Sequence, residues 1–478
     1  MSKKIFAGHV LRKVREGAGL TQVEFARRLG LSASYVNQLE SNQRPLSAAV
    51  LLSVGRVFSV DMASFEADDL DRIVADLGEA LADPIFRGQK PGLQELKAAA
   101  THAPDFARSF LDLHGAMRRV LEHQASVDDV ISAHGTSAQD KAKAALPYEE
   151  VRDHFHYIDN YVDTLDRAAE RAAKELGLAW HHDKARLIAG RLEARHAVSV
   201  DVADRPDPAA PILQFDAKRR IAVLALALPQ STRDFLLAGL LARFEAGELI
   251  EEHVASAGFH SHGADDVCRL ALKNHYAGAL LLPYQAFLDL ARASRHDLDR
   301  LQIVTGASLE QVCHRLSTLQ RPGNKGIPFY FVKIDRAGNV IKRHSATRFQ
   351  FARYGGACPM WNVHEAFEHL GSRTLVQVGE MPDGVRYLCL ARSAVKSSVN
   401  HRTRERRYAF GLGCELAYAS DVVYADGLAL GEKGEVTKIG INCRICPRDN
   451  CLERAFPAVD KKIALDPDVR GIVPFSLT

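Results

Sequence analysis

Near the N-terminus the sequence reads Leu20-Thr-Gln-Val-Glu-Phe-Ala-Arg-Arg-Leu-Gly-Leu-Ser-Ala-Ser-Tyr-Val-Asn-Gln-Leu-Glu-Ser-Asn-Gln-Arg-Pro45. Thr21 with Glu24 three residues later forms a capping box, which predicts the start of a short helix. Gly30 ends that helix, because glycine takes the left-handed conformation of a helix C-terminus without strain. Ser32 begins the next helix as its N-cap. Two short helices joined by a tight glycine turn predict a helix-turn-helix motif.

The apolar spacing in these two helices predicts which sides face a core. We expect Val23, Ala26 and Leu29 on the inner face of the first helix, and Val36 and Leu39 on that of the second. The polar side of the second helix then faces outward, where a recognition helix meets base edges in the DNA major groove. Asn and Gln suit this role because each can bond an adenine edge through two hydrogen bonds. The predicted DNA-contacting residues are Gln22, Ser32, Ala33, Ser34, Asn37, Gln38, Asn42 and Arg44.

The charge of the N-terminal segment supports this interpretation. Residues 1–60 carry nine Lys or Arg and three Asp or Glu, a local net charge of +6, whereas the whole chain has +3. A DNA-binding surface is therefore expected to be local to this head. Residues 20–45 closely resemble the phage-repressor-like helix-turn-helix family. Such heads bind palindromic sites as dimers, because one head buries too little surface for a specific complex.

Length and composition limit what the rest of the chain can be. With 478 residues, the prior is about three domains. Hydrophobic residues make up 47% and charged residues 25%, which excludes a wholly disordered, collagen-like or membrane-spanning chain. No apolar run approaches the roughly 20 residues of a spanning helix, and the N-terminal Met-Ser-Lys-Lys is unlike a signal peptide. We therefore expect a cytoplasmic protein without a membrane partner.

We predict a multidomain chain of four consecutive segments. An all-α helix-turn-helix head covers 1–70, and a helical linker region covers 71–147. A middle domain of helical and α+β character covers 148–325. An α+β domain with an antiparallel sheet covers 326–478.

Periodicity and turn residues indicate the individual elements. Residues 329–335 and 340–345 flank Arg-Ala-Gly-Asn, and 374–379 and 386–391 flank Pro-Asp-Gly, so each pair predicts a hairpin. The other expected elements are a linker over 138–145, helices over 148–176, 232–252, 265–282 and 285–294, and strands near 198, 221–228, 408–412 and 422–424.

The segment 234–249 resembles the helix that carries His-Glu-x-x-His in small metallopeptidases often fused to such heads. Zinc hydrolysis needs two His at i and i+4 on one helical face, with a Glu beside them as base. The corresponding positions here are Gly239, Leu240 and Arg243, and the third ligand position falls at Leu272. We therefore predict a degenerate zinc-peptidase-like domain that binds no zinc, in a protein that is not an enzyme. The nearby histidines expected on the surface or in loops are His253, His260 and His262.

The C-terminal region concentrates cysteine. Cys443, Cys446 and Cys451 form a Cys-x2-Cys-x4-Cys pattern in a chain with eight cysteines. In a cytosolic chain this pattern favours a metal or cluster site over disulfides. The residues alone favour zinc and a 4Fe–4S cluster about equally. Either would need a fourth ligand, for which we prefer Cys358 and keep Cys414 as the alternative. The cysteines expected as core thiols are Cys268, Cys313 and Cys389.

The head, the degenerate middle domain and the C-terminal cysteines together resemble the short-chain fatty acyl-CoA-responsive bacterial regulators. The most specific stretches are 311–323, 326–329 and 345–367. This resemblance implies a transcription factor that controls propionate, acetate or glyoxylate metabolism and binds a short-chain acyl-CoA as effector. Because part of the family carries a 4Fe–4S cluster, the resemblance also implies such a cluster here, with zinc as the alternative.

An acyl-CoA pocket needs Arg or Lys for the phosphates and an apolar end for the acyl chain. Two groups of cations are candidates for the phosphate contacts. The first group surrounds the first C-terminal hairpin and contains Arg321, Lys325, Lys342, Arg343, Arg348 and Arg353. The second group lies in the middle domain and contains Lys184, Arg186 and Arg191.

We therefore predict a homodimeric or homotetrameric transcription factor whose partners are promoter DNA and a short-chain acyl-CoA. Effector binding is expected to shift the population between DNA-competent and DNA-incompetent states. Two other classes of function are alternatives. One is an iron–sulfur redox sensor, and the other is a head-fused metallopeptidase, which the lost ligands disfavour.

Overall fold

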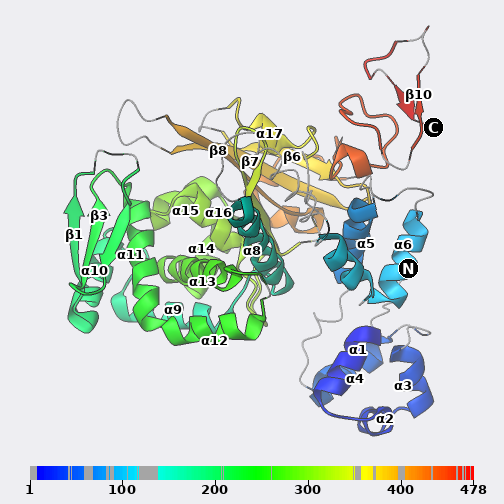
Figure 1. Cartoon of the computed structure of the whole chain (residues 1–478), viewed down its shortest axis with the longest axis horizontal. Coiled ribbons are helices and arrows are strands. Elements are labelled where there is room, and N and C mark those ends of the chain that lie inside the picture. The colour runs from blue at the N-terminus through cyan, green and yellow to red at the C-terminus, as the bar shows by residue number, and fades with distance from the viewer. Residues whose placement is uncertain are drawn as a thin grey trace. The chain divides into compact units, whose positions relative to one another are not determined.

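The computed structural model describes residues 8–40, 44, 46–58, 68–81, 86, 91–104, 106–115, 117, 138–205, 207, 209–259, 261–347, 349, 357–369, 373–396, 404–431, 434–458, 461–465, 468, 470–473 and 475–477. The chain divides into two compact units, and Figure 1 labels their helices and strands. The smaller unit consists of residues 1–129, 350–355 and 442–478, and the larger unit of 130–349 and 356–441. Both units therefore combine stretches far apart in sequence, unlike the four consecutive segments expected.

The helices of the head are α1 (Gly8–Gly17), α2 (Gln22–Leu29), α3 (Ala33–Glu40) and α4 (Ala48–Phe58), and α2 and α3 are the two helices predicted for the helix-turn-helix motif. Thr21 Oγ1 accepts a hydrogen bond from Glu24 N at 3.3 Å, and the Glu24 carboxylate accepts one from Thr21 N at 2.9 Å. These two bonds confirm the capping box at the start of α2. Gly30 has a φ of 69° and ends α2 as predicted. Ser32 Oγ accepts from Tyr35 N at 3.2 Å at the start of α3.

The core of the head differs from the predicted inner face at one residue. Val23 is 55% exposed, whereas Phe25 is fully buried and stacks on Phe58 with ring centroids 4.7 Å apart. Phe25 lies four residues before Leu29 and so shares its face of α2, and its ring buries more apolar area than a valine. The predicted core residues that are buried are Ala26, Leu29, Val36 and Leu39.

The rest of the smaller unit has a separate hydrophobic core between α5 (Asp68–Leu81) and α6 (Leu93–His102). Ile73, Leu77 and Leu96 are buried there. The C-terminal stretch of this unit contains an antiparallel pair formed by β10 (Ile463–Ala464) and β11 (Ser476–Leu477).

The larger unit contains most of the helices. They are α8 (Ala138–Tyr157), α9 (Asp163–Leu176), α10 (Lys184–His196), α11 (Gln230–Glu245), α12 (Gly247–Ala257), α13 (Ala264–Leu281), α14 (Tyr284–Ala293), α15 (Leu298–Thr305), α16 (Leu309–Ser317) and α17 (Asn362–Glu365). No helix of the described part of the chain is both long enough and apolar enough to cross a membrane.

Three predicted boundaries in this unit are wrong. The expected linker 138–145 belongs to α8, because its alanine- and lysine-rich composition has high helix propensity. The long helix expected over 148–176 is broken between α8 and α9, where Asp159 and Asn160 take positive φ values of 51° and 55°. The helix expected over 232–252 is broken at Ala246, which ends α11 and precedes α12.

Two sheets complete the larger unit. In the three-stranded sheet, β3 (Ile221–Ala225) pairs in parallel with β1 (Ser199–Ala203) and antiparallel with β2 (Leu213–Asp216), a strand that we did not predict. The six-stranded sheet has the order β5-β4-β8-β7-β6-β9. Its strands are β4 (Tyr330–Ile334), β5 (Val340–Ser345), β6 (Leu375–Glu380), β7 (Arg386–Lys396), β8 (Arg406–Glu415) and β9 (Thr437–Lys438).

Both predicted hairpins are confirmed, since β4 pairs antiparallel with β5 and β6 with β7. The strand expected over 422–424 is wrong. Two 3-10 helices, η2 (Leu416–Asp421) and η3 (Val423–Ala425), follow β8 instead, and Ala425 N donates to Val422 O at 3.0 Å. Bonds of this i to i+3 type satisfy the backbone without a strand partner.

One hydrophobic core runs through the larger unit from Val151 on α8 to Ala425 on η3. Helices α8 and α16 contact β5, and α16 also contacts β4. The boundary expected near residue 325 therefore does not separate two cores.

Candidate functional site

The recognition helix α3 presents the predicted polar face to solvent. Ser34 and Asn37 are exposed and Gln38 is half-buried, while Val36 and Leu39 are buried on the opposite side. Ser32 is exposed and Ala33 half-buried at the start of the helix. The orientation needed for a major-groove contact is therefore present in the free head.

A buried acid at the end of α3 ties the head together, and sequence reasoning missed it. Glu40 is only 3% exposed and accepts hydrogen bonds from Arg15 Nε at 2.7 Å and from Gln22 Nε2 at 2.8 Å. Gln22 Nε2 also lies 3.5 Å from Asn37 Oδ1. Gln22, one of the predicted DNA-contacting residues, thus helps to hold α1, α2 and α3 together through Glu40. No local pattern signals this, because Arg15 and Glu40 are 25 residues apart.

Of the remaining predicted DNA contacts, the structure describes only Arg44, which follows α3 in sequence. Arg44 is exposed, and its guanidinium lies over the Tyr35 ring at 5.7 Å from the centroid. Asn42 is outside the described residues.

The helix that resembles a zinc-peptidase helix is α11, and its ligand positions offer no metal donors. Leu240 and Leu272 are buried, and the exposed Arg243 lies over the Phe215 ring at 5.2 Å. His253 is not a simple surface residue, because it is half-buried with its Nε2 3.0 Å from His154 Nε2 on α8. The two other histidines of that prediction are His262, which is exposed, and His260, which lies outside the described residues.

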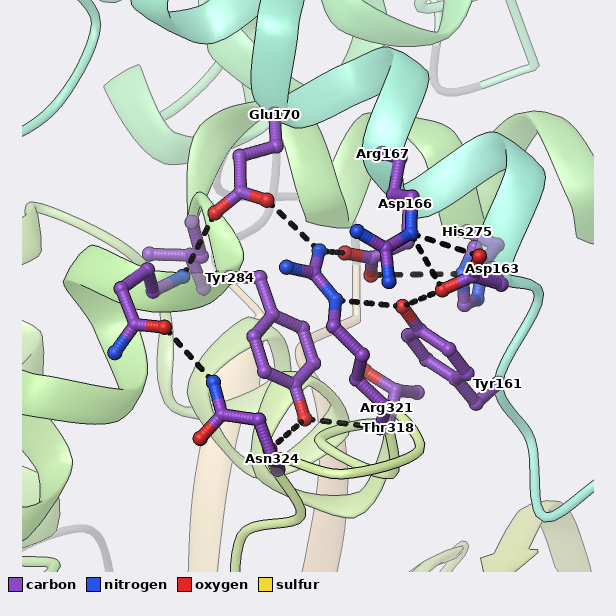
Figure 2. A network of polar contacts seen from close by, with 12 residues as sticks. Tyr161, Asp163, Asp166, Arg167, Glu170, His275, Tyr284, Thr318, Arg321 and Asn324 are labelled. Carbon is purple, nitrogen blue, oxygen red and sulfur yellow. Dashed lines mark hydrogen bonds and ion pairs between the residues drawn. The ribbon is translucent and has the colours of Figure 1, made fainter. Parts of the chain in front are cut away.

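A network of buried charges lies between α9, α13, α16 and the loop that follows α16 (Figure 2). Asp166 on α9 is fully buried and accepts hydrogen bonds from Arg315 Nη1 at 2.5 Å and Arg321 Nη2 at 3.0 Å. Arg321 Nη2 also donates to Glu170 at 2.8 Å, and its Nε donates to the Tyr161 hydroxyl at 2.9 Å. The ion pairs and hydrogen bonds offset the desolvation cost that each of these buried charges would carry alone.

This network corrects the prediction for Arg321. Instead of standing at the mouth of an effector pocket, the side chain is 8% exposed and its guanidinium lies over the Tyr284 ring at 4.0 Å. Arg321 N donates to Tyr284 Oη, and Tyr284 Oη donates to Asn324 O, both at 2.9 Å. Asn324 Nδ2 in turn donates to Gln285 Oε1 at 2.8 Å. Arg321 is therefore the anchor of the loop 321–326.

His275 on α13 lies next to the network without joining it. Its Nε2 is buried, is 3.8 Å from Asp166 Oδ2, and has no hydrogen-bond partner among the described residues. Burial lowers the pKa of His275 to about 4, although the nearby Asp166 opposes the shift. The imidazole is therefore neutral in the folded protein at neutral pH.

This burial makes the larger unit acid-sensitive. An unfolded histidine titrates near 6.5, so between pH 6.5 and 4 the unfolded chain binds a proton that the folded chain excludes. Stability is full above this window and falls as the pH is lowered through it. At pH 5 we expect a loss of about 2 kcal/mol from His275 alone. Urea titrations at pH 7 and pH 5 measure it. The loss should shrink in His275→Gln and persist in the exposed control His262→Gln, and an unchanged loss in His275→Gln would contradict the assignment.

A cavity of about 440 Å³ opens beside the loop 321–326. Two successive residues at its wall, Arg295 and His296, have φ values of 48° and 61°, a conformation that is rare outside glycine. Val423 N donates to Arg295 O at 2.8 Å, and the His296 Nδ1–H group donates to Asp421 O at 3.2 Å. The lining residues are Arg292, Arg295, His296, Lys325, Gly326, Ile327, Tyr418, Ser420 and Asp421.

Of the predicted effector contacts, Lys325 lines this cavity and the other described cations do not. Arg343 Nη2 lies 3.7 Å from Asp153 on α8 and its side chain is only 16% exposed. Burial lowers the pKa of Lys342 to about 8. Arg348 and Arg353 are outside the described residues.

The second predicted group of cations serves mainly structural contacts. Lys184 is buried and donates to Thr305 O at 2.5 Å. Arg191 bridges Glu175 at 2.7 Å and Glu245 at 2.6 Å, and Arg186 is exposed. Sequence reasoning missed Arg292 and Arg295, because they carry no signal apart from their position in α14 and the turn after it.

The cysteine triplet lies in a loop of the smaller unit. Cys446 is buried, Cys443 and Cys451 are half-buried, and all three are free thiols. The buried Arg454 orders this loop, since its guanidinium donates to Cys443 O at 2.8 Å and Cys446 O at 3.0 Å. Arg454 Nε is buried without a hydrogen-bond partner among the described residues.

The donor set of this loop suits a thiolate-bound metal or cluster. Across the described residues, however, no three His, Cys, Asp or Glu side chains are gathered closely enough to hold one metal ion. The two candidates for a fourth ligand, Cys358 and Cys414, belong to the larger unit. Cys414 is fully buried in its hydrophobic core, where burial raises the pKa of the thiol.

The three cysteines expected as core thiols are confirmed as buried. In each case burial raises the pKa of the thiol to about 12, so these groups stay protonated at neutral pH. They are Cys268, Cys313 and Cys389.

Three families match successive parts of the chain. Residues 11–65 match a helix-turn-helix family, 195–317 match the IrrE N-terminal-like domain, and 318–475 match the C-terminal domain described as "Short-chain fatty acyl coenzyme A regulator". These matches agree with the predicted head, degenerate middle domain and C-terminal domain.

Similar proteins cover the chain from end to end. A propionyl-CoA carboxylase regulator of Cereibacter sphaeroides is 46% identical over 100% of both chains. The HTH-type transcriptional regulator PrpR of Mycobacterium tuberculosis is 38% identical over 99% of this chain and 96% of its own. RamB of the same species is 37% identical over 99% and 98%. A solved structure of a Mycobacterium tuberculosis transcriptional regulator superposes with a TM-score of 0.66 at 39% identity, covering 69% of this chain and 99% of that one.

Proposed function

Because the chain belongs to the family of short-chain fatty acyl coenzyme A regulators, which are DNA-binding transcription factors, we propose that a short-chain acyl-CoA controls how tightly it binds its promoter. The genes under its control are those of short-chain acyl metabolism, including propionate. The observation that carries this proposal is the outward polar face of α3, joined in one chain to a body with the C-terminal domain of this family. The positions of a zinc-peptidase active site hold Gly239, Leu240 and Arg243, so this helix offers no zinc ligands, and the similar proteins are named as regulators.

The proposed mechanism is a population shift. Two heads, brought together in a homodimer or homotetramer, read the two halves of a palindromic site. An acyl-CoA that binds one state of the body better than the other changes the fraction of molecules whose heads fit the DNA. Typical coupling between two such sites changes affinity by about 5–150-fold.

The effector proposal is tested on the full chain with operator DNA selected from a random pool. The dissociation constant for the operator is measured with and without saturating propionyl-CoA. A change of about fivefold or more in either direction supports acyl-CoA control. An identical constant under both conditions, with oxidation changing it instead, would favour the iron–sulfur redox sensor.

The DNA-binding face is tested by Asn37→Ala. We expect it to cost roughly 1–3 kcal/mol of specific binding and to relax base preference at one position of each half-site, because it removes a base-edge contact. Arg44→Ala is the matched control for a phosphate contact. It should weaken all sequences about equally and reduce the salt slope by about one. Unchanged operator preference in Asn37→Ala would show that α3 does not read the bases there.

For the cysteine loop we propose a 4Fe–4S cluster held by Cys443, Cys446 and Cys451, with Cys358 as fourth ligand. Three free thiols in one ordered loop support it, and the burial of Cys414 in an apolar core makes that alternative less suitable. A bound cluster would give the protein a visible absorption and anchor the C-terminal tail.

Substitution of the cysteines tests this proposal. Cys→Ser at 443, 446 or 451 should each abolish the absorption of anaerobically purified protein, because each removes one iron ligand. Cys268→Ser and Cys313→Ser are controls that should keep it. Comparing Cys358→Ser with Cys414→Ser identifies the fourth ligand. Colourless protein with one zinc per chain would instead make this a structural zinc site.

A further inference from the structure

We propose that the cavity lined by Arg292 and Lys325 binds the phosphorylated nucleotide end of the effector. This inference rests on the proposed acyl-CoA function and assigns it a place in the larger unit. The cavity, at about 440 Å³, falls in the range of small-molecule sites and suits the nucleotide part of a coenzyme A ester. All of its lining residues come from the larger unit.

Besides Arg295, the cavity is lined by the cations Arg292 and Lys325, and among the described residues only Lys325 has a carboxylate close enough for an ion pair. Arg292 is exposed at the end of α14, and its Nη2 donates to Lys325 O at 3.1 Å, which keeps the two residues together. Lys325 Nζ is 3.8 Å from Asp159 Oδ2, and both side chains are more than one third exposed, so water weakens this pair. Phosphate oxygens are suitable partners for such a pair of cations.

The third cation of the wall has a different role. Arg295 donates to both carboxylate oxygens of Asp426, at 2.7 and 2.8 Å, and to Ser420 O at 3.0 Å. Its charge is therefore largely compensated, and it fastens the segment after β8 to the turn after α14. Arg295 is a positioning residue for the cavity and not a phosphate ligand.

The other walls favour a nucleotide over a simple anion. Tyr418 is 37% exposed and offers an aromatic face on which a purine can stack. Ile327 is buried and adds apolar surface. Asp421 would repel a bare phosphate, but a carboxylate can accept a hydrogen bond from an adenine amino group or a ribose hydroxyl.

The backbone of the wall is held in an unusual conformation. Arg295 and His296 are consecutive non-glycine residues with positive φ, a strain that persists only where surrounding contacts impose it. Val423 N and Asp421 O supply those contacts through hydrogen bonds to Arg295 O and His296 Nδ1. Strain of this kind occurs preferentially at ligand-binding sites, because it fixes the site before the ligand arrives.

The cavity is directly connected to the buried charge network. Lys325 is the residue after Asn324, whose carbonyl and side chain are bonded to Tyr284 and Gln285. Arg321 at the start of the same loop is paired with Asp166 and Glu170 of α9. A ligand that holds Lys325 therefore acts on a loop that is fastened at its other end to α9.

The test measures ligand binding to the full chain by calorimetry. The ligands are propionyl-CoA, the propionyl thioester of N-acetylcysteamine, which lacks the nucleotide, and adenosine 3′,5′-bisphosphate, which lacks the acyl arm. We expect Arg292→Gln combined with Lys325→Gln to weaken propionyl-CoA and the bisphosphate by about tenfold or more, since each loses a charged hydrogen bond. Binding of the nucleotide-free thioester should not change. Arg300→Gln, an exposed arginine on α15 outside the cavity, is the matched control and should bind all ligands as the unsubstituted chain does.

The possible outcomes separate this inference from the proposed function. If the double variant binds propionyl-CoA as tightly as the unsubstituted chain, the nucleotide site lies elsewhere and acyl-CoA control is unaffected. If the unsubstituted chain binds adenosine 3′,5′-bisphosphate but not propionyl-CoA, and the variant binds neither, the cavity is a nucleotide site and the acyl-CoA proposal fails. If inorganic phosphate competes as well as the bisphosphate does, the cavity takes any anion and the nucleotide assignment is overturned.

Discussion

Replacing Arg315 by alanine should lower the free energy of unfolding of the larger unit by about 3–5 kcal/mol. The substitution removes a guanidinium that bonds Asp166 through two nitrogens, at 2.5 and 3.3 Å, inside a fully buried site. It also leaves Leu282 O without the hydrogen bond that Arg315 Nε donates at 2.8 Å. Asp166 would keep Arg321, but part of its carboxylate would be buried without compensation.

A urea titration followed by circular dichroism measures this loss. The matched control is Arg167→Ala on the same helix as Asp166, because Arg167 pairs with Asp163 in a half-exposed ion pair. Water screens such a pair, so the control should change the unfolding midpoint very little. Replacing both partners, with Arg315→Met and Asp166→Leu, should recover much of the stability, since no buried charge is then left alone. Equal midpoints for Arg315→Ala and Arg167→Ala would contradict the assigned role of the network.

Phe25→Ala should abolish operator binding by unfolding the head. Nine of the described residues form the buried core of the head, and Phe25 supplies the largest of their side chains, fully buried against Phe58. Removal of a buried phenylalanine costs about 3–5 kcal/mol, which is comparable to the whole stability of so small a core. The core of the larger unit contains none of these residues and should be unaffected.

Thermal unfolding and operator titration on the same samples test this prediction. The control is Val23→Ala, two residues away on α2 but 55% exposed, which should change stability by no more than about 0.5 kcal/mol. If the two variants lose stability equally, the face of α2 that packs inward has been assigned wrongly. If Phe25→Ala lost operator binding while the head stayed folded, the Phe25 ring would be needed for DNA binding itself and not for the stability of the head.

The sequence predicted those structural elements that are determined by residues close together in the chain. The Thr21 and Glu24 capping box, the Gly30 turn and both hairpins each depend on a few neighbouring residues, and all are confirmed. The outward face of α3 follows from helical spacing alone, which is why Asn37 is where the pattern placed it.

Features made by distant residues could not be predicted in this way. Asp166 and Arg315 are 149 residues apart, and neither has a local pattern that marks it as buried. The cavity takes residues from the end of α14 and the turn after it, from the loop after α16 and from the segment after β8, so only the assembled fold brings Arg292 and Lys325 to one place. Arg321 is an example. Its charge led us to predict a contact with the phosphates of an effector, but in the fold its side chain is buried and paired with Asp166 and Glu170.

The discontinuity of the smaller unit has a consequence for how the protein is made. Its residues 1–129 leave the ribosome before the larger unit, whereas residues 442–478, which belong to the same smaller unit, are synthesised after it. At roughly 5–20 residues per second the two stretches are separated by tens of seconds, during which the whole larger unit emerges. The core of the head can form early, because the described residues of this core all lie between Leu11 and Val54. The cysteine loop can join the unit only after the larger unit has been synthesised, so a chain that stalls before it carries a DNA-reading head without the cysteine loop of the same unit.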